Sequence, residues 1–270
     1  MMTRWHYAPF AFALLVFSAS GCSSQDKHED AKKKNQQGLD AHAAGDYDLA
    51  ISCFTEVLRL EPKNERAFNN RATSWRAKKE YEKAISDCEE AIRLNPKFAE
   101  AFNTRGNVRS NRGEYDKAIQ DFGEAIRLDP RLAPAYYNRG IVWFEKKEFG
   151  IAIKDYDESI RLNPNQAETF NNRGRAYLCQ NQHDKAIQDF GEAIRIKPRL
   201  PEPFNNRAVA WNAKREFKKA ILDCEEAIRL HPAYAVAYFN RALAYESMGE
   251  FGRATADLEH AYRIDPSLKK

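Results

Sequence analysis

Apolar and small side chains recur along the chain every three or four residues, in pairs of stretches separated by a short polar turn. In the stretch that begins at residue 65, Phe68, Ala72 and Trp75 share one side of a helix, and Ala84 and Ala91 share one side of the next. This spacing is typical of amphipathic α-helices. The pattern therefore predicts an all-α protein built from helix pairs.

The helix pairs repeat with one fixed period. Prolines stand at 62, 96, 130, 164, 198, 232 and 266, each 34 residues after the last. Taking each proline as position 32 divides residues 31–268 into seven units without gaps: 31–64, 65–98, 99–132, 133–166, 167–200, 201–234 and 235–268. Such units bury their apolar faces by stacking on their neighbours, which predicts a solenoid.

Several positions of the unit hold one kind of side chain throughout. Position 4 is Phe or Tyr in units 2 to 7, position 8 is Gly or Ala in all seven, and position 20 is always alanine. This arrangement resembles the tetratricopeptide repeat over 238 of the 270 residues. The resemblance implies a right-handed superhelical solenoid of seven helix-turn-helix units, whose first helices line a concave groove that binds other proteins.

Every unit from the second onward carries arginine at position 7 and aspartate at position 23. Unit 1 has Gln37 and Cys53 there, so pairing within a unit satisfies every charge, while pairing with the next unit would leave Arg71 and Asp257 alone. We expect bidentate ion pairs between the two helices of one unit, with a structural role. The expected pairs are Arg71–Asp87, Arg105–Asp121, Arg139–Asp155, Arg173–Asp189, Arg207–Asp223 and Arg241–Asp257.

Asparagine is frequent at positions 5 and 6, away from the apolar stripe of the first helix. Asparagine is a mediocre helix former, and its amide both donates and accepts hydrogen bonds as a peptide group does. In the family that the sequence resembles, this face lines the groove, so we expect the amides to hold the main chain of an extended peptide; the alternative is that they are simply solvated. The candidates are Asn69, Asn70, Asn103, Asn138, Asn171, Asn172, Asn205, Asn206 and Asn240.

The fourth unit interrupts this polar row with apolar side chains. Tyr137, Ile141 and Phe144 form a second stripe on its first helix, beside the stripe expected in the core. A helix that is apolar on two faces is either buried or presents a contact patch. We expect a mid-groove anchor for an aromatic or aliphatic side chain of the partner; packing between coils of the superhelix is the alternative.

The first thirty residues differ from the rest of the chain. Arg4 is followed by an uncharged, mostly apolar run to Gly21, too short for a comfortable membrane span, which predicts a signal peptide over residues 1–21. Small residues before Cys22 resemble the lipobox of bacterial lipoproteins, which implies acylation of Cys22; ordinary secretory cleavage is the alternative. Residues 22–30 are expected to comprise the lipidated cysteine and a charged tether. The resemblance implies a lipid-anchored protein of the bacterial cell envelope, at the outer membrane and facing the periplasm.

Composition argues against other classes of protein. Lys and Arg total 43 and Asp and Glu 39, interleaved along the helices, which indicates a solvated surface and no nucleic-acid partner. The six histidines and five cysteines show no metal-ligand spacing, and Cys88 and Cys224 fall at position 24, in the expected core. No phosphate loop or nucleophile elbow occurs. We expect no catalytic residue, metal or cofactor.

The sequence thus predicts a membrane-tethered, non-catalytic scaffold that binds extended segments of cell-envelope proteins in its concave groove. Two alternatives stand beside it. One is a structural protein that associates with itself through its last repeat, and the other is an accessory subunit of an envelope enzyme complex.

Overall fold

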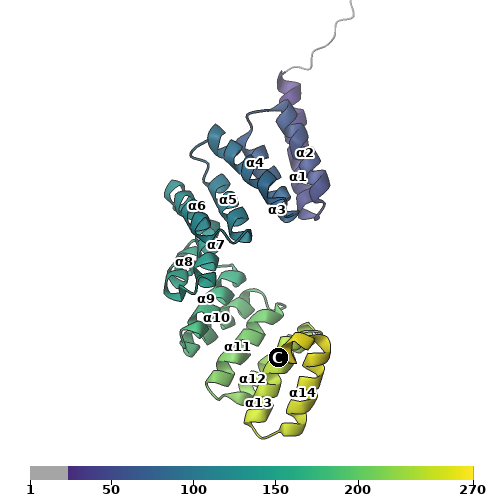
Figure 1. Cartoon of the computed structure of the whole chain (residues 1–270), viewed down its shortest axis with the longest axis vertical. Helices are drawn as coiled ribbons and strands as arrows, with labels where there is room; N and C mark the ends of the chain where they lie inside the picture. The colour runs from purple at the N-terminus through teal and green to yellow at the C-terminus, as the bar shows by residue number, and fades with distance from the viewer. Residues whose placement is uncertain (1–23, 270) are drawn as a thin grey trace, which may run out of the picture.

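The computed structural model describes residues 24–269, which form fourteen α-helices and one short 3-10 helix (Figure 1). Their bounds are α1 (Ser24–Ala43), α2 (Tyr47–Leu60), α3 (Glu65–Ala77), α4 (Tyr81–Leu94), α5 (Ala99–Asn111), α6 (Tyr115–Leu128), α7 (Ala133–Glu145), α8 (Phe149–Leu162), α9 (Ala167–Cys179), α10 (His183–Ile196), α11 (Pro201–Ala213), α12 (Phe217–Leu230), α13 (Ala235–Ser247), α14 (Phe251–Ile264) and η1 (Pro266–Lys269). The predicted all-α solenoid of seven helix pairs is confirmed.

The turns explain why every unit has the same length. Position 15, between the two helices, takes a left-handed backbone in all seven units; it is glycine in three, as at Gly113 (φ 76°), but Lys147 adopts the same conformation (φ 63°). The second helix ends two residues before the proline. In unit 2 the amide of Asn95 still donates to the carbonyl of Ala91 at 2.9 Å, and Pro96 cannot continue the series because it lacks an N–H group.

Contacts between units bend the stack. The first helices of successive units, which carry odd numbers, contact one another, whereas within residues 24–269 the second helix of a unit contacts only first helices and η1. The odd-numbered helices therefore lie on the inner side of the curve seen in Figure 1. We call the surface formed by positions 2, 5, 9 and 12 of these helices the concave face.

In units 1 to 6 the space between the two helices is filled in two ways. In four units position 8 is glycine and position 24 is aromatic, and a Cβ on Gly174, for example, would lie 2.7 Å from the ring of Phe190. In units 2 and 6 position 8 is alanine and position 24 is a fully buried cysteine. The glycine pairs are Gly38–Phe54, Gly106–Phe122, Gly140–Tyr156 and Gly174–Phe190, and the alanine pairs are Ala72–Cys88 and Ala208–Cys224. The large ring is thus accommodated by removing a methyl group from the facing helix.

The beginning of the described chain corrects one expectation. Residues 24–30, which we assigned to a tether, are the start of α1. This segment contains neither glycine nor proline and is rich in good helix formers. It is also held by tertiary contacts, because Ala31 is 2 % exposed in a cluster with Val57, and His28 Nδ1 lies 2.7 Å from Glu61 Oε1. The first repeat therefore has a longer first helix than the others.

The expected signal peptide (1–21) and Cys22 lie outside the described residues. Among the helices of residues 24–269, none has both the length and the apolar character needed to cross a membrane. After the last unit, η1 packs against α14.

Candidate protein-binding face

The structure brings each arginine of position 7 against the aspartate at position 23 of its own unit. The pairs are bidentate through one edge of the guanidinium: in five units Nε and Nη2 each lie 2.7–2.8 Å from a carboxylate oxygen. The aspartates are buried. The hydrogen bond that Arg139 donates to Asp155 raises the pKa of Arg139, against the opposing effect of burial, so this guanidinium stays charged. These pairs join the two helices of a unit behind the concave face.

The remaining nitrogen of the arginine points to the preceding unit, a contact that was not predicted from the sequence. Arg173 Nη1 lies 2.6 Å from Asp157 in unit 4, and Arg71 Nη1 lies 3.0 Å from Thr55 in unit 1. In units 3 and 5 the corresponding residues are Gly123 and Gly191, which have no side chain to accept a hydrogen bond from the arginine of the next unit. The arginine therefore also links neighbouring units at two boundaries, through Thr55 and Asp157.

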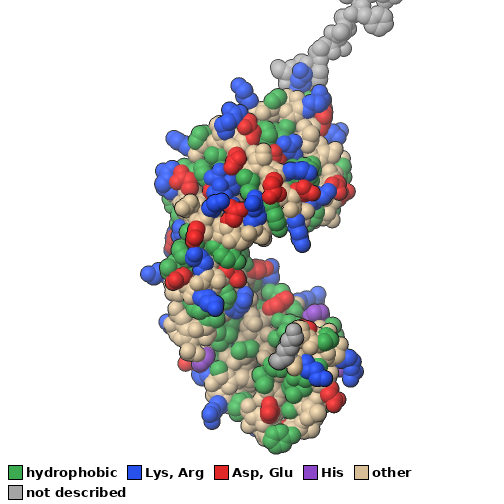
Figure 2. All heavy atoms as spheres, in the orientation of Figure 1, with side chains coloured by type: hydrophobic (Ala, Val, Ile, Leu, Met, Phe, Trp, Pro, Cys, Tyr) green, Lys and Arg blue, Asp and Glu red, His purple; other side chains and the backbone are tan. Residues whose placement is uncertain are grey.

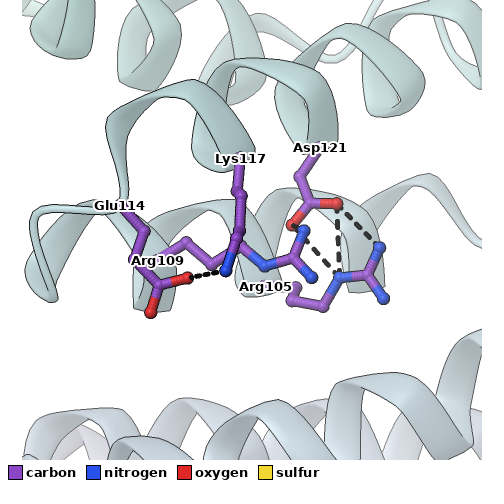
Figure 3. A network of polar contacts seen from close by, with 5 residues as sticks. All are labelled: Arg105, Arg109, Glu114, Lys117 and Asp121. Carbon is purple, nitrogen blue, oxygen red and sulfur yellow. Dashed lines mark hydrogen bonds and ion pairs between the residues drawn. The ribbon is translucent and has the colours of Figure 1, made fainter.

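Unit 3 carries a second arginine in this network. Arg109 replaces the aromatic residue of position 11, and its Nη1 lies 2.8 Å from Asp121 Oδ2, so Asp121 is shared between Arg105 and Arg109 (Figure 3). In units 2 and 6 a tryptophan at this position instead contacts a lysine through its ring. Unit 3 thus exchanges a packed ring for an extra charge.

The asparagines of positions 5 and 6 pair with one another across the unit boundaries. The amide nitrogen at position 6 donates to the side-chain oxygen at position 5 of the preceding unit, 35 residues earlier in the chain. The distances are 3.3 Å for Asn70–Asn35, 3.0 Å for Asn138–Asn103, 2.9 Å for Asn206–Asn171 and 2.8 Å for Asn240–Asn205, and at unit 4 Asn172 donates to the hydroxyl of Tyr137 at 3.1 Å. The amides therefore connect successive repeats, a role beyond the peptide contacts that we expected.

These pairs differ in what they leave for a partner. Asn205 and Asn240 are 3 % and 8 % exposed, so that pair is closed to a ligand. Asn171 and Asn206 are half-buried. Each keeps one polar group, Nδ2 of Asn171 and Oδ1 of Asn206, without another hydrogen bond in the described chain and not sealed from solvent. Such pairs can still bind a peptide main chain.

The row of side-chain hydrogen bonds between units is interrupted once. Position 6 of unit 3 is Thr104, which is buried, and the Asn69 Oδ1 that would face an amide there is buried without a hydrogen bond. An unsatisfied buried acceptor costs about 1–3 kcal/mol. The boundary between units 2 and 3 therefore lacks one hydrogen bond that its neighbours have.

The apolar stripe of unit 4 is partly covered by the chain itself. Tyr137, Ile141 and Phe144 are half-buried and pack with Tyr156 and Ala176. Burial raises the pKa of Tyr137, so its hydroxyl is protonated when it accepts from Asn172. The anchor that we expected is therefore one wall of an aromatic cluster rather than three free side chains.

Arg175 of unit 5 covers this cluster. Its guanidinium carbon lies 4.8 Å from the centre of the Phe144 ring, and Nη1 is 3.4 Å from Asn172 Oδ1. Stacking on a ring suits the planar guanidinium. Arg175 was not predicted from the sequence, although its place at position 9, one unit after Ile141, was the available signal.

Residues 24–269 contain no group of three His, Cys, Asp or Glu side chains arranged to hold a metal ion. Three of the described cysteines, Cys53, Cys88 and Cys224, are buried, and Cys179 is exposed.

Models of known repeat families match most of the chain. Models described as tetratricopeptide repeat match residues 35–97, 88–120, 133–166, 167–200 and 235–268, and one described as TPR repeat matches 106–147. The chain belongs to the tetratricopeptide repeat family. Tetratricopeptide repeat domains bind other proteins and are typically non-catalytic, so this chain is a protein-interaction scaffold.

Solved structures of tetratricopeptide repeat proteins superpose on most of the chain. The structure described as PilF of Pseudomonas aeruginosa has a TM-score of 0.69 at 18 % identity, covering 83 % of this chain and 98 % of that one. A tetratricopeptide repeat protein of Parabacteroides merdae has a TM-score of 0.63 at 20 % identity, covering 88 % and 94 %. YrrB, described as having an unusual peptide-binding site, has a TM-score of 0.57 at 23 % identity, covering 68 % and 95 %. These similarities show the fold.

Proposed function

We propose that the chain is a membrane-tethered scaffold that binds extended segments of other cell-envelope proteins along its concave face, with Cys22 as the lipid attachment site. The observation that carries the binding part is the concave face itself. Seven odd-numbered helices form it, and it presents the remaining polar atoms of half-buried amide pairs beside an apolar cluster. Figure 2 shows this side of the molecule as a deep hollow between the N-terminal and C-terminal units.

An extended segment suits this surface for geometric reasons. A peptide main chain presents donors and acceptors at regular intervals, and Asn171 Nδ2 and Asn206 Oδ1 offer one of each. Tyr137, Ile141 and Phe144 add an apolar wall one unit away. YrrB, which has a related fold, is described as having a peptide-binding site, and this supports the same use here. The peptide contacts that we propose for the candidate asparagines are therefore made by the amide atoms not engaged between repeats.

Site-directed photo-crosslinking in cells tests binding on this face. A benzoylphenylalanine in place of Val209, which is 36 % exposed on α11, should capture a partner protein identifiable by mass spectrometry. The matched control is the same substitution at Ile151, which is 41 % exposed on the second helix of unit 4. Equal capture from both positions, or none from Val209, would contradict a partner-binding concave face.

The anchor needs a separate test. The Cys22→Ser variant should lose incorporation of labelled palmitate and appear in the soluble fraction after cell lysis. Cys179→Ser, at the exposed cysteine of the folded part, is the control and should keep both properties. Unchanged labelling of Cys22→Ser would exclude Cys22 as the acylated residue.

The last repeat offers less to self-association than the sequence suggested. Leu258, on which stacking would depend, is half-buried against Ala242, Tyr245 and Ala254 of its own unit. We therefore keep partner binding as the proposed function.

A further inference from the structure

The C-terminal third of the concave face exposes apolar side chains. On α11 and α13, Val209, Val236 and Leu243 are 36 %, 36 % and 40 % exposed, and Phe239 is half-buried beside them. Val236, Phe239 and Leu243 are spaced three and four residues apart, which places them on one stripe of α13. We call these four residues the C-terminal apolar row. In Figure 2 charged side chains are dense over the N-terminal units, while hydrophobic surface borders the hollow over the C-terminal units.

Apart from the Oδ1 of Asn206, no amide of a candidate asparagine is available in this region. The asparagine pair behind the row, Asn205 and Asn240, is buried and internally bonded. The Nδ2 of Asn212 is also engaged, since it donates to the main-chain carbonyl of Asn240 at 3.0 Å. A ligand of units 6 and 7 therefore makes its contacts with side chains, and apolar side chains of its own fit the exposed row best.

The charge of this surface is the second property that a ligand must match. Glu202 on α11 and Glu246 on α13 flank the C-terminal apolar row, are exposed, and form no ion pair with any described residue. Glu168, at position 2 of α9, is paired with Lys197. Outside the ion-paired position 7, Arg175 is the one cation on α7, α9, α11 and α13, and it lies against the ring of Phe144. The C-terminal half of the concave face is thus net negative.

The N-terminal units show the opposite arrangement at the same repeat positions. Position 2 is Lys32 in unit 1 and Arg66 in unit 2, both exposed, and position 12 of unit 2 is Arg76. No carboxylate of the described residues pairs with Arg66 or Arg76. The two ends of the concave face therefore select for opposite charge.

We infer that units 6 and 7 bind an aliphatic protein segment that carries positive charge, with its apolar side chains on the C-terminal apolar row and its lysines or arginines at Glu202 and Glu246. The inference rests on the proposed function, since it names the chemistry of the partner on that face. Apolar contact supplies the affinity, and the two glutamates set the sign of the charge that is accepted.

Fluorescence anisotropy with defined peptides on the full-length chain in detergent tests the inference. The first probe is a labelled twelve-residue peptide of leucine, lysine and serine; in the second glutamate replaces lysine, and in the third serine replaces leucine. We expect binding of the first peptide alone, weakened by added salt.

The chain supplies matched controls for each substitution. Leu243→Ser should weaken binding of the leucine–lysine peptide about tenfold or more, whereas Leu39→Ser, at position 9 of unit 1 and equally 40 % exposed, should leave it unchanged. Glu202→Gln and Glu246→Gln should each weaken it about two- to fivefold. Glu100→Gln, at position 2 of unit 3 and also exposed, is their control.

Other outcomes overturn the inference in recognisable ways. Equal binding of the lysine and glutamate peptides, or equal effects of Leu243→Ser and Leu39→Ser, would exclude a selective C-terminal site. Sedimentation of a wild-type dimer that Leu243→Ser dissociates would show a second copy of the chain on the row instead. If the peptides fail while crosslinking from Val209 still captures a partner, the inference is wrong and the proposed function stands; if both fail, the proposed function is wrong as well.

Discussion

Units 5 and 6 fill the space between their two helices with different pairs of residues. In unit 5 Gly174 allows the ring of Phe190 to lie against the backbone of the first helix. In unit 6 Ala208 restores a methyl group and Cys224 replaces the ring, and both residues are fully buried. Neither residue of a pair can be judged alone, because each is the right size only for its partner. Repeats that look interchangeable in sequence therefore carry two distinct cores.

The largest effect should come from removing the ring. Phe190→Ala should lower the free energy of unfolding by about 3–5 kcal/mol, because it leaves a large cavity beside Gly174. Cys224→Ala should cost about 1 kcal/mol, because little volume is lost. Urea denaturation followed by circular dichroism measures both. Similar losses for the two variants would mean that the two cores are not different in the way described.

Adding a methyl group tests the same contact from the other helix. Gly174→Ala should destabilise the chain by about 1–3 kcal/mol through overpacking against Phe190, although alanine is the better helix former. Combined with Phe190→Cys, which recreates the pair of unit 6, the same change should become favourable. A double-mutant cycle should give a coupling of about 2–3 kcal/mol. Additive effects would contradict paired positions.

The second glycine of unit 5 sharpens the comparison. Gly191 lies on α10, and the nearest atom to a Cβ there is 3.9 Å away. Gly191→Ala should therefore raise the free energy of unfolding by about 1 kcal/mol, as helix propensity alone predicts. Gly123→Ala, in the equivalent position of unit 3, should do the same. Destabilisation by either variant would show that the surrounding space is smaller than the structure indicates.

The smallest expected effect concerns Cys88 and Cys224, the buried thiols of units 2 and 6. Burial raises the pKa of Cys224 to about 12, so the thiol remains protonated, and unreactive, at about pH 8. Cys179 is exposed. Brief treatment with iodoacetamide followed by peptide mapping should modify Cys179 and leave Cys88 and Cys224 unmodified. Equal modification of all three would indicate that units 2 and 6 open readily.

The repeat period made the fold predictable, because proline, alanine and glycine at fixed positions each report a local requirement of the helix pair. The pairing of arginine with aspartate within one unit could also be predicted, because unit 1 lacks both residues. The amide pairs were not predicted, because their geometry depends on how one unit sits on the next. A signal was nevertheless present: Asn171 and Asn206, like the other pairs, are 35 residues apart, and Thr104 stands at that distance from Asn69.

Side chains that depend on more than one unit were the hardest to predict. Arg175 belongs to one repeat but lies on a ring of the previous one, and Asp157 binds an arginine of the next. Helix α1 exceeded its expected length because a polar segment without apolar periodicity can still be helical when Ala31 and His28 find contacts on α2 and the following loop. Local patterns determined the units, while the joints between units required the structure.

The missing amide bond next to Asn69 has a mechanical consequence. Each unit in a stack of repeats touches only its neighbours, so the stiffness of the stack depends on the contacts at each boundary between units. The boundary between units 2 and 3 lacks a hydrogen bond that the other boundaries have. We therefore expect bending under load to be easiest there, between the first two units and the five that follow.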